Sequence, residues 1–285
     1  MTEASEAIET KFQQALDLHM QGQLGPAEVL YQEILQAEPR HFHTLHLLGV
    51  AAGQKGQAEV AIDLIGRAIA INPNDGATYA NRGNALRDLQ RYDEALASYD
   101  RALAIQPDVA EVLNNRGLVL QQLMRHEDAL ASFDRSLAVQ PDSAEVLDYR
   151  GLTLYALKRY DDAVASFDRA LAIQPRSVEL LSHRGIALHQ LRRYEDALAS
   201  FDRALAIQPD SPALLINRGP ALQELTRLPE ALASYDRALA LSPDTPEGHY
   251  NRGNTLDLLR RYDDARASYD RALAIRPDFP DALHN

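Results

Sequence analysis

The chain has 285 residues, a formal net charge of −12 and no cysteine. Without cysteine it has no disulfide, no thiolate metal ligand and no cysteine nucleophile, and its acidic balance argues against nucleic acid, whose phosphates are bound mainly by Lys and Arg. Hydrophobic residues make up 46% of the sequence but aromatic residues only 6%, which favours helices packed through Ala and Leu over a thick aromatic core.

The N-terminal stretch predicts neither a signal peptide nor a membrane anchor. Residues 1–12, MTEASEAIETKF, are acidic and lack the basic segment and the apolar run of a secretory signal. No stretch of the chain approaches the length of a membrane span. We therefore expect a cytoplasmic protein without membrane contact, and we interpret residues 1–7 as a short leader before the first helix.

From residue 8 onward the sequence repeats with a period of 34 residues. The clearest copy, Ala110 to Ser143, aligns with near-copies of itself on both sides when it is shifted by one period. A period of this length predicts a single elongated solenoid in which each unit contacts only its neighbours. We divide the chain into eight units, at 8–41, 42–75, 76–109, 110–143, 144–177, 178–211, 212–245 and 246–279, and interpret 280–285 as the start of a truncated ninth.

Each unit contains two stretches in which apolar residues recur at helical spacing. In the fourth unit, Leu113 and Leu120 belong to the first stretch, and Ala129 to Val139 forms the second. Pro141 cannot continue the second helix, and Asp142 is the residue that we expect to cap the next one. Each unit is therefore predicted to fold as helix, turn, helix, turn.

This pattern resembles the tetratricopeptide repeat. That family has a bulky residue at position 4, Gly or Ala at 8, a large apolar residue at 11, Ala at 20, an aromatic residue at 24, Ala at 27 and Pro at 32. The fourth unit has at these positions Leu113, Gly117, Leu120, Ala129, Phe133, Ser136 and Pro141. Gly or Ala at position 8 and Pro at position 32 recur in all eight units. The resemblance implies an all-α, right-handed superhelical solenoid of antiparallel helix pairs.

The first two units differ from the other six and carry a second resemblance. They have Gln14 and Leu48 at position 7, where the others have Arg. Over residues 8–75 the sequence resembles the first repeats of bacterial arrays that precede a sugar-transferase domain of the O-linked N-acetylglucosamine transferase type. This resemblance implies an alternative function, in which the chain recruits substrates for a larger sugar transferase.

The tetratricopeptide resemblance also implies a binding groove. In the family, positions 2, 5, 6, 9, 12 and 13 of successive first helices face a concave surface. The corresponding candidates here are Asn81, Asn84, Asn114, Asn115, Leu118, Tyr149, Leu152, Tyr155, His183, Ile186, Asn217, Tyr250, Asn251 and Asn254. Asn can pair with both the C=O and the N–H of a peptide, and Tyr adds apolar area with a polar tip. We therefore predict a protein or peptide ligand.

Two known uses of such a groove can be compared with these residues. Asn at position 6 of units three, four, seven and eight resembles the asparagine ladder of the sugar-transferase arrays, although Tyr149 and His183 interrupt it. The alternative is that Asn is common at this position whatever the ligand.

The carboxylate clamp of co-chaperones needs Lys at positions 2 and 5, and position 2 here holds Glu111, Glu145 and Glu179. A carboxylate ligand would therefore meet like charge.

Units three to eight also share a charged pair of positions. Position 7 holds Arg82, Arg116, Arg150, Arg184, Arg218 and Arg252, and position 25 holds Asp100, Asp134, Asp168, Asp202, Asp236 and Asp270. We predict that they pair as a structural ladder between hairpins, because a half-buried charge is tolerated only when it is paired. The alternative is that duplication copied both residues without contact between them.

Two further features depend on single residues or a short stretch. Pro220 lies inside the first helix of unit seven, where we expect a kink or a frayed helix and a wider groove near Ile216 and Asn217. Among His41, His43 and His46 only the last two share a helical face, and no carboxylate stands at ligand spacing, so we predict a solvated turn and no metal there.

The favoured function is a non-catalytic scaffold or adaptor that binds a protein or peptide segment in its groove. No glycine-rich phosphate loop and no hydrolase or metalloprotease signature occurs, so we expect no enzyme activity, no cofactor and no metal. A third alternative is a structural protein that self-associates end to end through its last repeat. Groove chemistry of this kind does not name the ligand.

Overall fold

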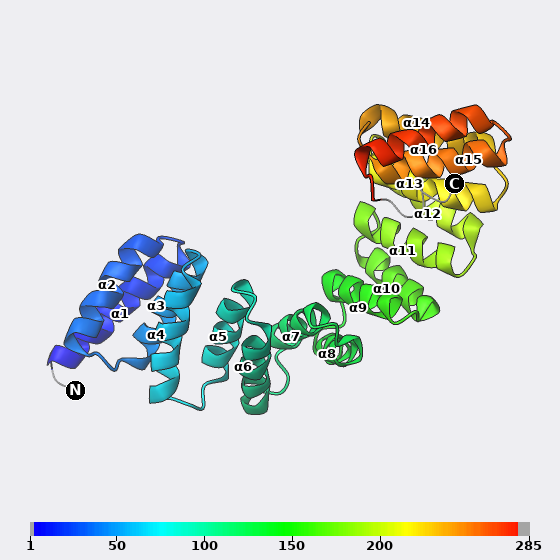
Figure 1. Ribbon diagram of the computed structural model, residues 1–285. Helices are drawn as coiled ribbons and strands as arrows, with labels where there is room; N and C mark the ends of the chain where they lie inside the picture. The colour runs from blue at the N-terminus through cyan, green and yellow to red at the C-terminus, as the bar shows by residue number, and fades with distance from the viewer. Residues whose placement is uncertain (1–2, 279–285) are drawn as a thin grey trace. The chain divides into compact units, whose positions relative to one another are not determined.

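The computed structural model describes residues 3–278, which consist of helices joined by short turns (Figure 1). The helices are α1 (Glu3–Met20), α2 (Leu24–Ala37), α3 (Phe42–Gln54), α4 (Ala58–Ile71), α5 (Gly76–Asp88), α6 (Tyr92–Ile105), α7 (Ala110–Gln122), α8 (His126–Val139), α9 (Ala144–Ala156), α10 (Tyr160–Ile173), α11 (Val178–Gln190), α12 (Tyr194–Ile207), α13 (Pro212–Glu224), α14 (Leu228–Leu241), α15 (Pro246–Leu258) and α16 (Tyr262–Ile275). No helix in this range is both long and apolar enough to cross a membrane.

Consecutive helices pack as antiparallel hairpins, α1 with α2, α3 with α4 and so on to α15 with α16. Each hairpin lies within one of the 34-residue units, apart from the start of α1. The expected all-α arrangement of helix pairs is therefore confirmed.

The contacts separate the chain into two compact units, Met1–Pro141 and Asp142–Asn285. The first contains α1 to α8 and the second α9 to α16. We expected one continuous solenoid, because the 34-residue period runs across this boundary without insertion or deletion. The sequence period therefore gives no sign of the division.

Within each unit the first helices of neighbouring repeats lie against one another. In the first unit α3 contacts α5 and α5 contacts α7, and in the second α9 contacts α11, α11 contacts α13 and α13 contacts α15. Second helices of neighbouring repeats have no comparable contact among the described residues. The first helices therefore lie on the inner side of each unit, where a groove would form.

Two predictions about helix ends were wrong. The leader predicted at residues 1–7 is helical from Glu3, because EASEAI contains neither Pro nor Gly that would break a helix. The cap of α9 is Ser143 rather than Asp142, since the Ser143 hydroxyl lies one residue before the helix and accepts from the N–H of Val146 at 3.3 Å. The truncated ninth unit predicted at residues 280–285 lies outside the described residues.

The two helices of a hairpin touch where position 8 meets the aromatic ring of position 24. A Cβ atom added to Gly117 would lie 2.5 Å from Cε1 of Phe133, and the same clash arises between Gly185 and Phe201 at 2.7 Å. These rings are buried. Glycine is required here because a side chain would push the ring out of the hairpin.

The predicted Arg and Asp ladder is confirmed where both partners lie in one unit. Arg116 on α7 donates through Nε to Asp100 on α6 at 2.7 Å and through Nη1 to Ser132 on α8 at 2.6 Å. The same arrangement recurs in the second unit for Arg184 with Asp168 and Ser200, Arg218 with Asp202 and Ser234, and Arg252 with Asp236 and Ser268. Each such arginine joins the second helix of its own repeat to that of the preceding repeat.

The ladder does not extend from the third repeat, which contains Arg82, to the second repeat. Arg82 donates to Ser98 at 3.1 Å, but the preceding repeat has Gly66 where an aspartate would stand. In the complete pairs the arginines are largely buried and the aspartates are about half exposed. The ladder therefore lies at the surface edge of the hairpins.

The frayed helix predicted at Pro220 was wrong, because α13 is a continuous helix that contains this proline. Ala221 and Leu222, which follow it, are fully buried, and Leu222 packs with Ala231 and Tyr235 of α14. The burial of these two side chains offsets the backbone hydrogen bond that Pro220 cannot make. A wider groove near Ile216 and Asn217 stays a prediction.

The turn between the two helices of a repeat needs a left-handed backbone. The first two repeats use Gly22 and Gly56, at φ 74° and 75°. The other six use Gln90, Met124, Lys158, Arg192, Thr226 and Arg260, at φ between 57° and 60°. Thr226 is the most strained of these because it is β-branched.

We expect Thr226→Gly to stabilise the chain. Relief of the left-handed strain is worth about 1–2 kcal/mol, and the greater freedom of glycine in the unfolded chain removes about half of that gain. Urea unfolding should therefore show a gain of roughly 0.5–1 kcal/mol. Gly56→Thr should lower stability by a similar amount, and a loss of stability in Thr226→Gly would contradict the argument.

We expect Asp202→Asn to weaken the ladder slightly. Asp202 accepts from Arg218 at 2.7 Å but is 49% exposed, so loss of its charge should cost roughly 0.5 kcal/mol, and less in high salt. Asp270→Asn is the matched control, because Asp270 occupies the same repeat position without an arginine partner among the described residues. Equal effects of the two substitutions in urea unfolding would rule out a specific contribution of the pair.

Candidate functional site

The predicted groove residues lie on the first helices of their repeats, and all of them are half-buried. Neighbouring positions on the same helices, such as Leu113 and Gly117, are buried in the hairpins. Side chains that are partly packed and partly exposed can contact a ligand while they hold a fixed position. Their role in binding stays a prediction.

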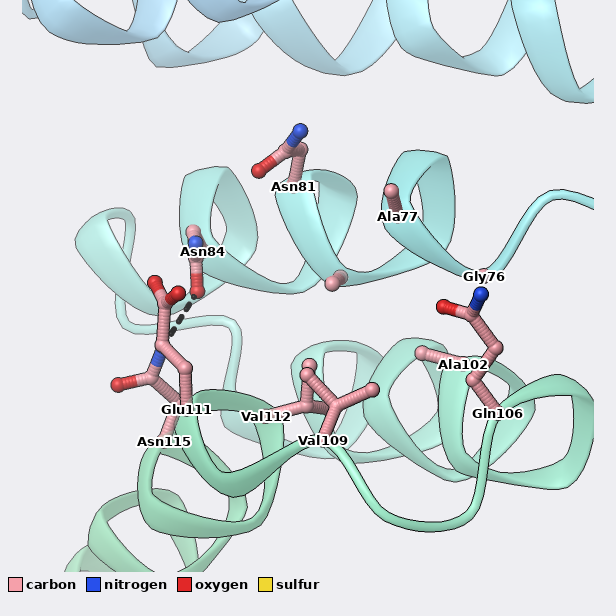
Figure 2. A pocket seen from close by; sticks show the side chains of 11 residues that line it. Gly76, Ala77, Asn81, Asn84, Ala102, Gln106, Val109, Glu111, Val112 and Asn115 are labelled. Atoms are coloured by element: carbon pink, nitrogen blue, oxygen red, sulfur yellow. Dashed lines mark hydrogen bonds between the residues drawn. The ribbon is translucent and has the colours of Figure 1, made fainter. Parts of the chain in front are cut away.

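In the first unit, amide side chains connect α5 to α7. Asn115 donates through Nδ2 to Oδ1 of Asn84 at 3.1 Å (Figure 2), and the same oxygen accepts from the Tyr99 hydroxyl at 2.8 Å. Arg87 donates to Oδ1 of Asn115 at 3.1 Å. The oxygen of Asn84 thus has both lone pairs in use, whereas Asn115 keeps one N–H and one lone pair.

Two cavities adjoin this amide pair. The cavity in Figure 2, of about 150 Å³, is lined by the polar residues Asn81, Asn84, Gln106, Glu111 and Asn115 and by small or apolar residues. The other, of about 260 Å³, extends toward α3 and is also lined by Asn81 and Asn84. Asn81 and Asn84 therefore line a cavity on each side of α5, one toward α3 and one toward α7.

Asn81 is held by a histidine of the preceding repeat. Its Nδ2 lies 2.8 Å from Nε2 of His46. Burial lowers the pKa of His46, although the charge of Asp75 partly opposes this. The imidazole is therefore neutral near pH 7 and accepts a hydrogen bond from the amide.

The tyrosines of the predicted groove in the second unit are also fixed by neighbours. Tyr149 donates to Glu145 at 2.9 Å, and burial together with this carboxylate raises the pKa of Tyr149 to about 12. The ring of Tyr155 packs on that of Tyr160 at 5.3 Å, and the ring of Tyr250 lies 6.0 Å from that of Tyr269. Their exposed edges are therefore presented in defined orientations.

A charged cluster in the second unit was not identified from the sequence. Nδ1 of His183 on α11 lies 2.8 Å from Oδ1 of Asp148 on α9, which is only 9% exposed, and Glu179 lies one turn before His183. Burial lowers the pKa of His183, but the hydrogen bond and charge of Asp148, with Glu179, outweigh it and raise the pKa overall. The sequence contains these residues, but only the structure shows that position 5 of one repeat faces position 6 of the next.

The three histidines near residue 43 have structural contacts. Nδ1 of His41 accepts from the backbone N–H of Thr44 at 3.3 Å, which caps α3. The ring of His43 packs on Phe42 and Phe12, at 5.0 and 6.0 Å between centroids. His46 supports Asn81, as described above.

Family models for known proteins match most of the chain. Models described as tetratricopeptide repeats match residues 42–75, 64–97, 108–176, 150–212 and 216–280, and one described as a TPR repeat matches residues 83–123. No curated protein sequence matches the chain. Nothing in these matches bears on the sugar-transferase resemblance of residues 8–75.

Solved structures agree at low sequence identity. The C-terminal part of a TPR repeat-containing protein from Cytophaga hutchinsonii is 16% identical, with a TM-score of 0.68 over 86% of this chain and 98% of that chain. A tetratricopeptide repeat protein from Parabacteroides merdae is 22% identical, with a TM-score of 0.64 over 85% and 96%. The Cut9–Hcn1 hetero-tetramer of the APC/C is 15% identical, with a TM-score of 0.59 over 92% of this chain and 51% of that chain.

At such identities the solved structures establish the fold alone. The family matches, however, together cover residues 42–212 and 216–280, which is well over half of the sequence. The helix hairpins of the structure follow the same period. The chain therefore belongs to the tetratricopeptide repeat family.

Proposed function

We propose that the chain is a non-catalytic scaffold or adaptor of the cytoplasm that binds protein or peptide segments along its first helices. Repeats of this family are associated with protein interaction, and one similar structure is that of a protein assembly, the Cut9–Hcn1 hetero-tetramer. The inner side of each unit carries half-buried amide and aromatic side chains. These offer both hydrogen bonds and apolar area to another polypeptide.

The amide pair of the first unit is the observation that carries this proposal. Asn115 is fixed by Asn84 and Arg87, yet it retains one donor and one acceptor beside a cavity. An extended peptide offers the complementary C=O and N–H groups. Because Asn115 is already ordered, a peptide that binds there loses little of the affinity to ordering of the protein.

The acidic residues of the cavities restrict which peptides can bind. Glu111 lines the first cavity, and Glu145 and Glu179 line a cavity in the second unit. The chain as a whole has a net charge of −12. A neutral or basic segment suits this surface, whereas an acidic C-terminus would be repelled.

The self-association alternative has one observation in its favour. Leu258 and Tyr262, in the last described repeat, are 58% and 61% exposed, and exposed apolar side chains can contribute to a contact surface. Light scattering over a range of concentrations distinguishes the two proposals, because a constant monomer mass rules out self-association. The transferase-arm alternative rests on the resemblance of residues 8–75 alone.

We expect Asn115→Ala and Asn217→Ala each to weaken peptide binding. An unbiased displayed peptide library selected on the intact chain supplies the probes, and fluorescence anisotropy measures their affinity. Loss of one hydrogen-bonding amide costs about 1 kcal/mol, so the Kd of a peptide bound in that unit should rise about fivefold.

Asn74→Ala is the matched control, because Asn74 is an exposed loop residue away from the first-helix face. Circular dichroism should show that all three variants are folded. Selected peptides whose affinity is the same for Asn115→Ala, Asn217→Ala and the unaltered chain would contradict binding through these amides.

A further inference from the structure

The cluster of Asp148, Glu179 and His183 has the composition of a metal centre. Each residue offers one ligand atom, and the three atoms lie within 4.8 Å of one another. We propose that these side chains bind one divalent transition-metal cation of the Zn²⁺ or Mn²⁺ type. The ion would lie on the first-helix face of the second unit.

The backbone already places the three ligands together. Glu179 and His183 are four residues apart on α11, so they lie on the same helical face. Asp148 extends from the neighbouring first helix, α9, and Nδ1 of His183 lies 2.8 Å from its Oδ1. Ligand atoms of a metal with bonds of about 2.0–2.2 Å are themselves about 3 Å apart. A metal ion can therefore take the place of the proton between His183 and Asp148 with little movement of these two side chains.

The donor set narrows the class of ion. One imidazole nitrogen and two carboxylate oxygens suit zinc, manganese and related transition metals. Calcium and magnesium prefer oxygen ligands alone. Three protein ligands leave at least one coordination position for water or for a side chain of a bound partner.

The surroundings favour a cation and give it access. A cavity of about 290 Å³ is lined by Asp148 and Glu179 together with Glu145 and Tyr149, and none of its described lining residues is basic. Asp148 is buried, and a buried carboxylate needs a compensating positive charge. Glu179 is exposed, so its side chain can rotate to complete the ligand set.

An internal comparison shows that this cluster is not general to the repeat. The cavity of Figure 2 occupies the same place between two repeats of the first unit. There the corresponding residues are Ala80, Glu111 and Asn115, which offer one carboxylate and no imidazole. Among residues 3–278, the set of Asp148, Glu179 and His183 is found between α9 and α11 and has no counterpart between α5 and α7.

Titration calorimetry on the intact, chelator-treated chain tests the proposal with ZnCl₂ and MnCl₂ as probes. We expect one ion per chain, and about a tenfold or greater loss of affinity in His183→Asn and in Asp148→Ala. Both variants should fold, because Asn115, Asn217 and Asn251 occupy the repeat position of His183, and Ala80 occupies that of Asp148. Circular dichroism verifies this.

His43→Asn is the matched control, because it alters the separate group of histidines near α3, and it should leave binding unchanged. The double variant A80D/N115H copies the missing ligands into the first unit and should bind two ions. Absence of saturable binding to the unaltered chain would overturn the proposal, as would His183→Asn with undiminished affinity. A single ion in A80D/N115H would refute the claim that these three side chains suffice.

Discussion

The structure depends on the close approach of the two helices within each hairpin. In the third to eighth repeats that approach requires glycine at Gly117 and its counterparts, because the ring of Phe133 or its equivalent fills the space beside the backbone. The first repeat accommodates Ala15 at this position, fully buried. A hairpin of this kind cannot bury its apolar faces alone, so it must stack on a neighbour. Stacking then aligns the first helices along one side of each unit, and the surface properties of that side follow from which residues stand there.

In the later repeats the arginine at position 7 also sets the register between neighbouring hairpins. Arg116 reaches the second helix of its own repeat through Ser132 and that of the preceding repeat through Asp100. The aspartates are half exposed, so each pair adds little free energy. What the pairs contribute is geometry, because a guanidinium group that bonds to two helices at once restricts how the hairpins slide.

Much of the fold could be predicted from the sequence, because a repeated pattern carries the same information many times. Predictions that depended on a single residue were wrong in two cases. Pro220 predicted a kink or a frayed helix, but α13 runs through it without fraying, and Leu222 packs on Tyr235. Ser143 rather than Asp142 caps α9, because Ser143 lies directly before the helix and its hydroxyl reaches the N–H of Val146. The division after Pro141 depends on contacts that a uniform period does not describe.

The candidate site was predictable as a set of positions but not as a set of partners. Groove positions were considered helix by helix, whereas the structure joins position 5 of one repeat to position 6 of the next. His46 meets Asn81 in this way, and Asp148 meets His183, with the same 2.8 Å separation in both pairs.

The chemistry of the inner face is therefore determined pairwise between repeats. An imidazole with an amide makes a neutral contact, and an imidazole with a carboxylate and Glu179 makes a charged one. Two substitutions at these positions change the ligand that a repeat pair can bind without altering the hairpins beneath, because neither position belongs to the buried contact of glycine and ring. Repeats that share one scaffold can in this way carry different binding sites along the same chain.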